Sequence, residues 1–194
     1  MKKTLYHVSF RPVRELIPRV PRYRAAGENR ELKRICFSDS ILLALSAMPQ
    51  GVLCLIGARA AGIVPMLYIY EFHPGDNPGI RVLHDWEIAN YVPDAMTTHE
   101  HWVLDSPQVL QKTVCPVEDF TFRLTSGEGV EPFRRGYLLE TLRLGAPVKR
   151  PARTMRNQLR RIDAEQWKGI EKIDTKTILA YLGAKTERGG SHGI

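Results

Sequence analysis

The sequence predicts an α+β fold. Short segments rich in β-branched and aromatic residues dominate residues 5–124, whereas helical spacing dominates residues 134–182. Strands grouped before helices are typical of α+β proteins. We therefore expect a main domain over residues 1–132 and a basic, mainly helical C-terminal extension over residues 133–194, ending in a disordered tail.

The first elements expected are two strands and a buried helix. Leu5–Phe10 alternates and is rich in β-formers, which predicts a strand. Residues 11–34 contain three prolines and seven arginines, which predicts an irregular loop with at most a helical turn at 13–16. A second strand is expected at Arg34–Phe37. The apolar segment Ser40–Ala47 reads as a buried helix with Ser38 or Asp39 as its N-cap.

The remaining elements follow the same patterns. The continuously apolar segment Pro65–Phe72 is the strongest strand signal and predicts a central strand covered on both faces. The prolines and glycines of residues 73–79 predict a turn. Further strands are expected at five segments: Gly51–Ile56, Arg81–Leu83, His101–Leu104, Gln111–Val117 and Asp119–Leu124. Beyond Pro132, helices are expected at Arg134–Leu144 and over 153–182.

The net charge of +7 is distributed unevenly. Residues 1–34 hold ten Lys and Arg against three Glu, residues 35–132 hold four against twelve Asp and Glu, and residues 133–194 hold fourteen against six. Basic ends around an acidic middle are typical of proteins with an anionic partner, such as nucleic acid or a phosphate-bearing cofactor, and equally of a solvated surface.

Composition narrows the class of protein. No apolar run approaches the roughly 18 residues of a membrane span, and Met1-Lys2-Lys3-Thr4 is not followed by the apolar region of a secretory signal. The three cysteines have no Cys-x-x-Cys spacing, which indicates a reduced, cytoplasmic protein without a structural zinc site. No Rossmann or P-loop glycine motif is present.

His7 is the first candidate site residue. It lies in the first strand, and the hydroxyl of Ser9, two positions later, points to the same face. Histidine and serine together supply the donors and acceptors that ribose hydroxyls and a carboxamide need. A lone histidine is nevertheless more often structural than functional.

Phe37 and Ser38 end the second strand. An aromatic ring followed by a hydroxyl can form a stacking wall for a flat heterocycle such as nicotinamide. The simpler alternative is a core phenylalanine followed by a helix cap. The seven arginines from Arg11 to Arg34, among them Arg19, would hold a pyrophosphate or grip nucleic acid. They equally suit a surface loop paired with the acidic middle.

Two carboxylates are candidates for charge stabilisation. Glu100 stands at the mouth of a strand, where it can stabilise an oxocarbenium-like state, and Glu71 follows Tyr70 on the apolar strand. A buried carboxylate is costly unless it has a role or a partner. His99 and His101 share a side, but without a third ligand they make a weak metal site, so no metal is expected.

These segments together resemble the histidine-class ADP-ribosyltransferases, a class that includes rifamycin-modifying enzymes, RNA 2′-phosphotransferases and small phage effectors. Tyr6-His7-Val8-Ser9 is similar to their first strand, and Ile35-Cys36-Phe37-Ser38 to their second motif. Leu67–Phe72 is similar to the central strand that follows, and Thr98-His99-Glu100 to their third motif. The resemblance covers residues 5–118 and departs from the family at Val8, where glycine is usual, and at Phe37, where tyrosine is common.

The resemblance implies a split, mixed β-sheet with NAD in a cleft. It implies catalytic roles for His7 and for Glu100 or Glu71. It also implies NAD contacts from six residues: His7, Ser9, Arg19, Arg34, Phe37 and Ser38. ADP-ribose would pass to a protein or nucleic-acid acceptor, as in a toxin or effector. A non-catalytic nucleic-acid-binding protein and, more weakly, an RNA 2′-phosphotransferase remain alternatives.

Overall fold

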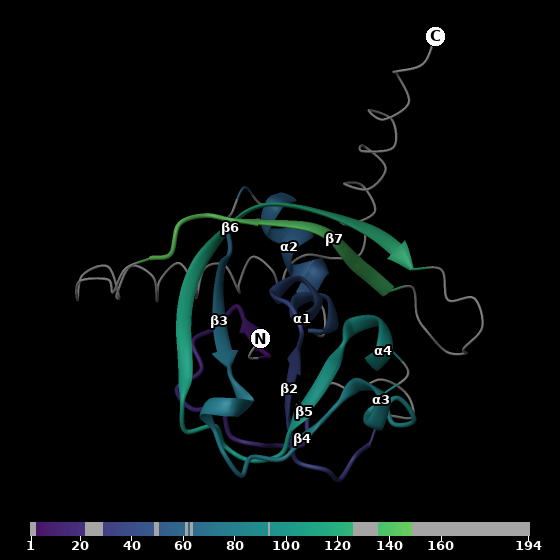
Figure 1. Cartoon of the computed structure of the whole chain (residues 1–194). Coiled ribbons are helices and arrows are strands. Elements are labelled where there is room, and N and C mark those ends of the chain that lie inside the picture. Colours follow the sequence, from purple (N-terminus) through teal and green to yellow (C-terminus); the bar gives the residue numbers. More distant parts are fainter. Residues whose placement is uncertain are drawn as a thin grey trace. The chain divides into compact units, whose positions relative to one another are not determined.

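The protein has an α+β fold built on one seven-stranded sheet (Figure 1). The computed structural model describes residues 3–21, 29–48, 51–60, 62, 64–92, 94–125 and 136–148. The strand order is β4-β5-β2-β1-β3-β6-β7. All pairings between the strands described are antiparallel, so the expectation of a mixed sheet is wrong.

The first five strands along the chain agree with the sequence. The bounds are Leu5–Ser9 for β1, Ile35–Ser38 for β2, Met66–Phe72 for β3, Val82–Leu83 for β4 and Glu100–Val103 for β5. Each falls within one residue of its predicted segment. These segments combine β-branched and aromatic residues with bounding prolines or polar turns, so local signals were sufficient to define them.

One face of the sheet carries His7 and is called the His7 face. Register places Leu5 beside Phe72 and His7 beside Tyr70, and antiparallel partners share a face. Phe37 and Val103 belong to the same apolar cluster. The loop after β1 covers part of this cluster, because Leu16 packs into it and the Tyr70 hydroxyl bonds the backbone of Val13.

The other face, called the Glu100 face, is covered near β5 by two short helices. These are α3 (Asp85–Ile88) and α4 (Ala95–Thr98). Ile88, Val92 and Ala95 pack on Trp102 from β5, which is fully buried. The sequence analysis did not foresee either helix, since four residues are too few to show helical periodicity.

The long strand β6 (Leu110–Thr125) changes partners along its length. Its first part pairs with β3 as far as Pro116, and from Val117 it pairs with β7 (Gly136–Leu144), with a register shift between Val117 and Asp119. Proline cannot donate to a ladder, and such irregularities bend a strand. Figure 1 shows β6 curving away from β3 to run beside β7. The two strands expected at 111–117 and 119–124 are therefore one.

Several element predictions are wrong. Arg134–Leu144 was expected to be helical, yet Gly136–Leu144 is a strand, so the sheet continues past the expected boundary at residue 132. Gly51–Ile56 was expected to be a strand and lies in helix α2 (Gly51–Ala60). No helical turn forms at 13–16. The N-cap of helix α1 (Ile41–Ala47) is Ser40, whose hydroxyl accepts from Leu43 N at 3.2 Å, and not Ser38 or Asp39.

The chain divides into two compact units. The first comprises residues 1–52 and 66–148 and contains the whole sheet, and the second comprises residues 53–65 and 149–194. The helices expected over 153–182 and the tail lie outside the described residues. In the described part of the chain no single helix is long and apolar enough to cross a membrane, although α1 and α2 together, as a bent pair, pass that test by length and composition.

Candidate functional site

His7 lies at the centre of the sheet with its ring held from two sides. The ring centroid is 5.8 Å from that of Phe37 and 5.9 Å from that of Tyr70. Nδ1 lies 2.9 Å from the carbonyl oxygen of Cys36 and must donate to it. Burial is the main cause that lowers the pKa of His7, opposed by this bond and aided by the charge of Arg19. The imidazole is therefore neutral at pH 7, and its Nε2 is a hydrogen-bond acceptor.

A single row of side chains crosses five strands on the His7 face. Register pairs His7 with Tyr70, Tyr70 with Lys112, and Phe37 with His101. The pairing of Tyr6 with Ser38 aligns His7 with Phe37. We call Lys112, Tyr70, His7, Phe37 and His101 the His7 row. It brings together residues that are far apart in the sequence.

Phe37 does not offer an open stacking surface. Its ring is 1% exposed and packs 5.4 Å from the ring of Phe72. Ser38 is equally buried. Phe37 does lie beside His7, but the expected nicotinamide stack on Phe37 is not compatible with this packing, because the ring is buried.

The two arginines predicted to contact NAD differ in their accessibility to solvent. Arg34 is 1% exposed; its guanidinium lies 3.9 Å from the centre of the Trp102 ring and donates to the carbonyls of Asn29 and Leu32. A pyrophosphate cannot reach it there, so Arg34 is a structural residue of the Glu100 face. Arg19 is exposed, pairs with Arg34 through backbone bonds only, and acts electrostatically on His7.

Neither predicted carboxylate lies on the His7 face. Glu100 is paired with Ser38, and Ser38 with Tyr6, whose other neighbour is Glu71. Both carboxylates thus belong to one row on the Glu100 face, three strand spacings or about 14 Å apart. Glu100 is 7% exposed and accepts a 2.8 Å bond from the Trp102 indole. The two cannot serve the same reacting atom.

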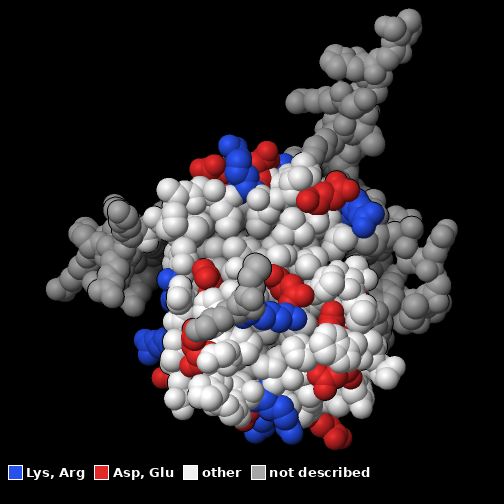
Figure 2. All heavy atoms as spheres, viewed as in Figure 1, with Lys and Arg blue, Asp and Glu red and all other residues white. Residues whose placement is uncertain are grey.

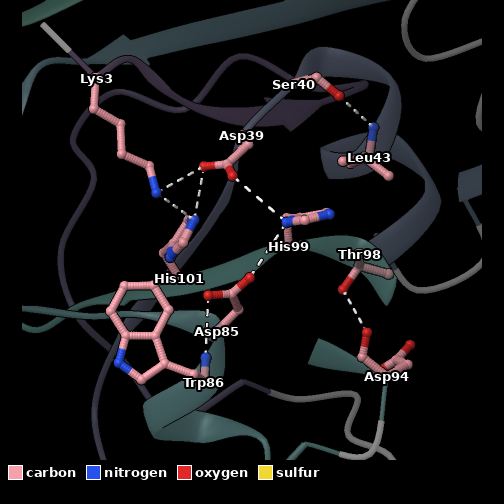
Figure 3. Close-up of polar contacts among 10 residues, drawn as sticks. All are labelled: Lys3, Asp39, Ser40, Leu43, Asp85, Trp86, Asp94, Thr98, His99 and His101. Carbon is pink, nitrogen blue, oxygen red and sulfur yellow. Dashed lines mark hydrogen bonds and ion pairs between the residues drawn. The ribbon is translucent and has the colours of Figure 1, made fainter. Parts of the chain in front are cut away.

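A charged cluster lies where β2 ends and β5 begins (Figure 3). One oxygen of Asp39 lies 2.8 Å from His101 Nε2 and 3.1 Å from Lys3 Nζ. His99 Nδ1 stands between the carboxylates of Asp39 and Asp85, at 3.6 and 3.3 Å. We call these residues the Asp39 cluster: Lys3, Asp39, Asp85, His99 and His101. His99 ends α4 in the left-handed region at φ 47°, which brings its ring toward both carboxylates.

The Asp39 cluster holds a carboxylate in its ionised form on the His7 face. Burial raises the pKa of Asp39, but hydrogen bonds from His101 and Lys3 outweigh it and the pKa lies below its ordinary value. Burial also lowers the pKa of His101, against the effect of Asp39. The fully buried His101 ring donates from Nε2, and its Nδ1 has no partner among the described residues. Asp39 is 36% exposed and therefore accessible.

Lys112 completes the polar groups of the His7 face. Its ammonium lies 5.4 Å from the centre of the Tyr68 ring and 5.3 Å from that of Tyr70, which are cation–π distances. Burial lowers its pKa. Ser9, partly exposed beside Tyr68, accepts a bond from the backbone of Arg11. The accessible polar groups here are thus an acceptor, a hydroxyl, two cations and a carboxylate.

Comparison with protein-family models, curated proteins and solved structures found no significant match.

Charge on the molecular surface is mixed. On the face shown in Figure 2, basic and acidic side chains of the described residues are interspersed and do not gather into one basic patch. Within the described part of the chain, no group of three or more His, Cys, Asp and Glu is arranged to hold a metal ion. The site's chemistry therefore rests on the histidine, carboxylate and cationic groups named above.

Sequence reasoning missed Asp39, His101, Tyr70 and Lys112. Asp39 looked like a helix cap, and Lys112 carried no local signal. These residues meet only through strand register, which a single sequence does not specify. The two-residue alternation along β1 did predict correctly that His7 and Ser9 lie on the same face.

Proposed function

We propose that the protein cleaves NAD at the nicotinamide glycosidic bond and transfers ADP-ribose to a protein or nucleic-acid acceptor. The bonding pair leaves with nicotinamide, positive charge develops at the ribose anomeric carbon, and the acceptor attacks that carbon and loses its proton. This proposal extends the resemblance of residues 5–118 to the histidine-class ADP-ribosyltransferases, whose split sheet and NAD cleft are part of the same proposal.

The observation that carries the proposal is the state of His7. Its Nδ1 is committed to the Cys36 carbonyl and its pKa is lowered by burial, so a partly exposed neutral imidazole offers Nε2 as an acceptor. A ribose hydroxyl donates to such an atom. Ser9 on the same face supplies a hydroxyl, and Arg19 a nearby positive charge. These groups fit the ribose and phosphate parts of NAD, whereas buried Phe37 does not fit the nicotinamide ring.

Two carboxylates compete for the role of stabilising the developing positive charge. The resemblance favours Glu100, but Glu100 is buried and lies on the face opposite His7. Geometry favours Asp39, which is accessible, ionised and on the His7 face. Glu71 is also disfavoured by its position. It lies on β3 beside Tyr6, on the face opposite His7.

The test is nicotinamide release from NAD by the full chain. We expect His7→Ala to abolish release and Asp39→Asn to lower it by roughly 10²–10³, whereas Glu100→Gln, on the opposite face, should lower it far less. The control is Glu118→Gln, a solvent-facing carboxylate whose ion pair with Arg143 spans 3.6 Å. Absence of release with protein and nucleic-acid acceptors, or full release in His7→Ala, would contradict the proposal.

A further inference from the structure

Lys112 is a cation without an acidic partner on the His7 face. Among the described residues its ammonium contacts the rings of Tyr68 and Tyr70, and no described carboxylate pairs with it. The acidic residue nearest along the neighbouring strand is Glu71, which the pleat turns to the Glu100 face. A lysine held against aromatic rings and away from carboxylates keeps its charge available to an anion.

The position of Lys112 relative to His7 is fixed by the sheet. Both belong to the His7 row, with Tyr70 between them, so their backbones are two strand spacings or about 10 Å apart. The long lysine side chain lies over the Tyr70 ring, which itself packs on His7. Lysine and imidazole therefore both contact the buried Tyr70 ring.

A second cation approaches the same place from the loop. Arg19 is exposed, and its charge is close enough to His7 to help lower the histidine's pKa. The bonds of Arg19 to Arg34 use the backbone alone, which leaves its guanidinium available. Two cations of different origin thus lie near the neutral imidazole: Lys112 on β6, over the Tyr70 ring that contacts His7, and Arg19 in the loop after β1.

We infer that the His7 face binds the phosphates of a nucleotide, with Lys112 as the main anchor, Arg19 as the second cation, and His7 accepting a hydrogen bond from the ribose. Two cations near a sugar-binding acceptor match a ligand that carries phosphate beside ribose. Lys112, the anchor on β6, belongs neither to the arginine-rich loop nor to the sequence motifs that suggested an NAD site.

This inference deepens the proposed function. Only the choice of an adenine nucleotide as the ligand rests on that proposed function. Nucleotide binding does not require that the glycosidic bond be cleaved, so the two can fail separately. Loss of ADP binding in Lys112→Met without any nicotinamide release in the wild type would leave the inference standing and the transferase proposal contradicted.

The experiment is calorimetric titration of the full chain with ADP and with adenosine. We expect ADP to bind at least tenfold more tightly than adenosine, with an affinity that falls as salt is raised. Lys112→Met should weaken ADP binding by roughly 10- to 100-fold, the worth of a charge-assisted hydrogen bond, and leave adenosine binding unchanged. Lys112→Arg should retain most of the affinity for ADP.

The matched control is Arg123→Met, which removes an exposed cation from the same strand. We expect it to bind ADP like the wild type, and thermal melts should show that all variants fold. Three results would overturn the inference: no ADP binding by the wild type, equal binding of ADP and adenosine, or an equal loss of ADP affinity in Lys112→Met and Arg123→Met. The first two need no variant.

Discussion

At the residue scale, the protein keeps three ionisable groups in defined states on one face of its sheet. Burial lowers the pKa values of His7 and His101, and hydrogen bonds from His101 and Lys3 overcome burial to lower that of Asp39. Neutral imidazoles and an ionised carboxylate are thus native-state properties at neutral pH. Their state follows from packing and partners, and residue type alone does not reveal it.

These shifts predict that stability falls as the medium is acidified. The unfolded histidines bind protons near their ordinary pKa of 6.5, whereas folded His7 and His101 bind them only at lower pH. The unfolded state therefore gains protons first as pH falls through this window, and the free energy of unfolding decreases. Asp39 has the same sign of effect, but below its ordinary value of 3.8.

The measurement is the urea midpoint at about pH 7.5 and about pH 5.5, where the histidine window lies. We expect the midpoint to fall on acidification and to fall less in His7→Gln. The control Asn90→Ala, at an exposed position that carries no ionisable group, should keep the wild-type dependence. A midpoint that rises on acidification would show that the sign is wrong.

At the element scale, short connections depend on single polar side chains. Asn77 is 4% exposed in the turn after the 3₁₀ helix Pro74–Asp76. Its amide nitrogen donates to the carbonyls of His73 and Val109, and its oxygen accepts from the backbone of Gln108 and Val109. Four bonds from one side chain join the turn after β3 to the segment that enters β6.

Asn77→Ala should lower the free energy of unfolding by about 3 kcal/mol, because it removes all four hydrogen bonds of a buried side chain. Urea denaturation checks this value. The control is Asn90→Ala, at an exposed turn position, for which we expect a change within about 0.5 kcal/mol. Equal effects of the two substitutions would mean that the network of Asn77 adds nothing to stability.

Loss of the N-cap of α1 should lower stability less than loss of the Asn77 side chain. Ser40→Ala removes the hydroxyl that accepts from Leu43 N and should cost about 1 kcal/mol. Ser40→Asp should restore most of that loss, because aspartate caps helices as well as serine. Thermal melts of the three proteins would test this, and a melt of Ser40→Ala equal to that of the wild type would exclude a capping role.

At the scale of the whole molecule, β7 extends the sheet beyond the expected domain boundary. Leu139 is 2% exposed, pairs with Phe122 on β6, and its backbone donates to the Ser46 hydroxyl on α1. Arg134–Leu144 was expected to be helical because Tyr137, Leu138 and Leu142 have helical spacing. The long-range pairing with β6 decides for the strand, since β6 would otherwise have an unpaired edge.

In a strand, neighbouring residues point to opposite faces, so substitutions at neighbouring positions of β7 should have very different effects on stability. Leu139→Ala should destabilise the protein by about 2–4 kcal/mol through loss of buried surface. Glu140→Ala, at an exposed position on the same strand, should change stability by less than about 0.5 kcal/mol. Urea denaturation of both variants checks the alternation, and a small effect at Leu139 would contradict the packing described for it.

The sequence by itself determined the first five strands along the chain, the helix α1 and the shared side of His7 and Ser9. It could do so because composition, turn residues and two-residue alternation are local properties of a chain. Only the tertiary structure decided that Phe37 and Arg34 are buried, that Glu100 lies on the face opposite His7, and that Asp39 and Lys112 join His7. Strand order and register made these decisions, and they depend on contacts between segments far apart in sequence.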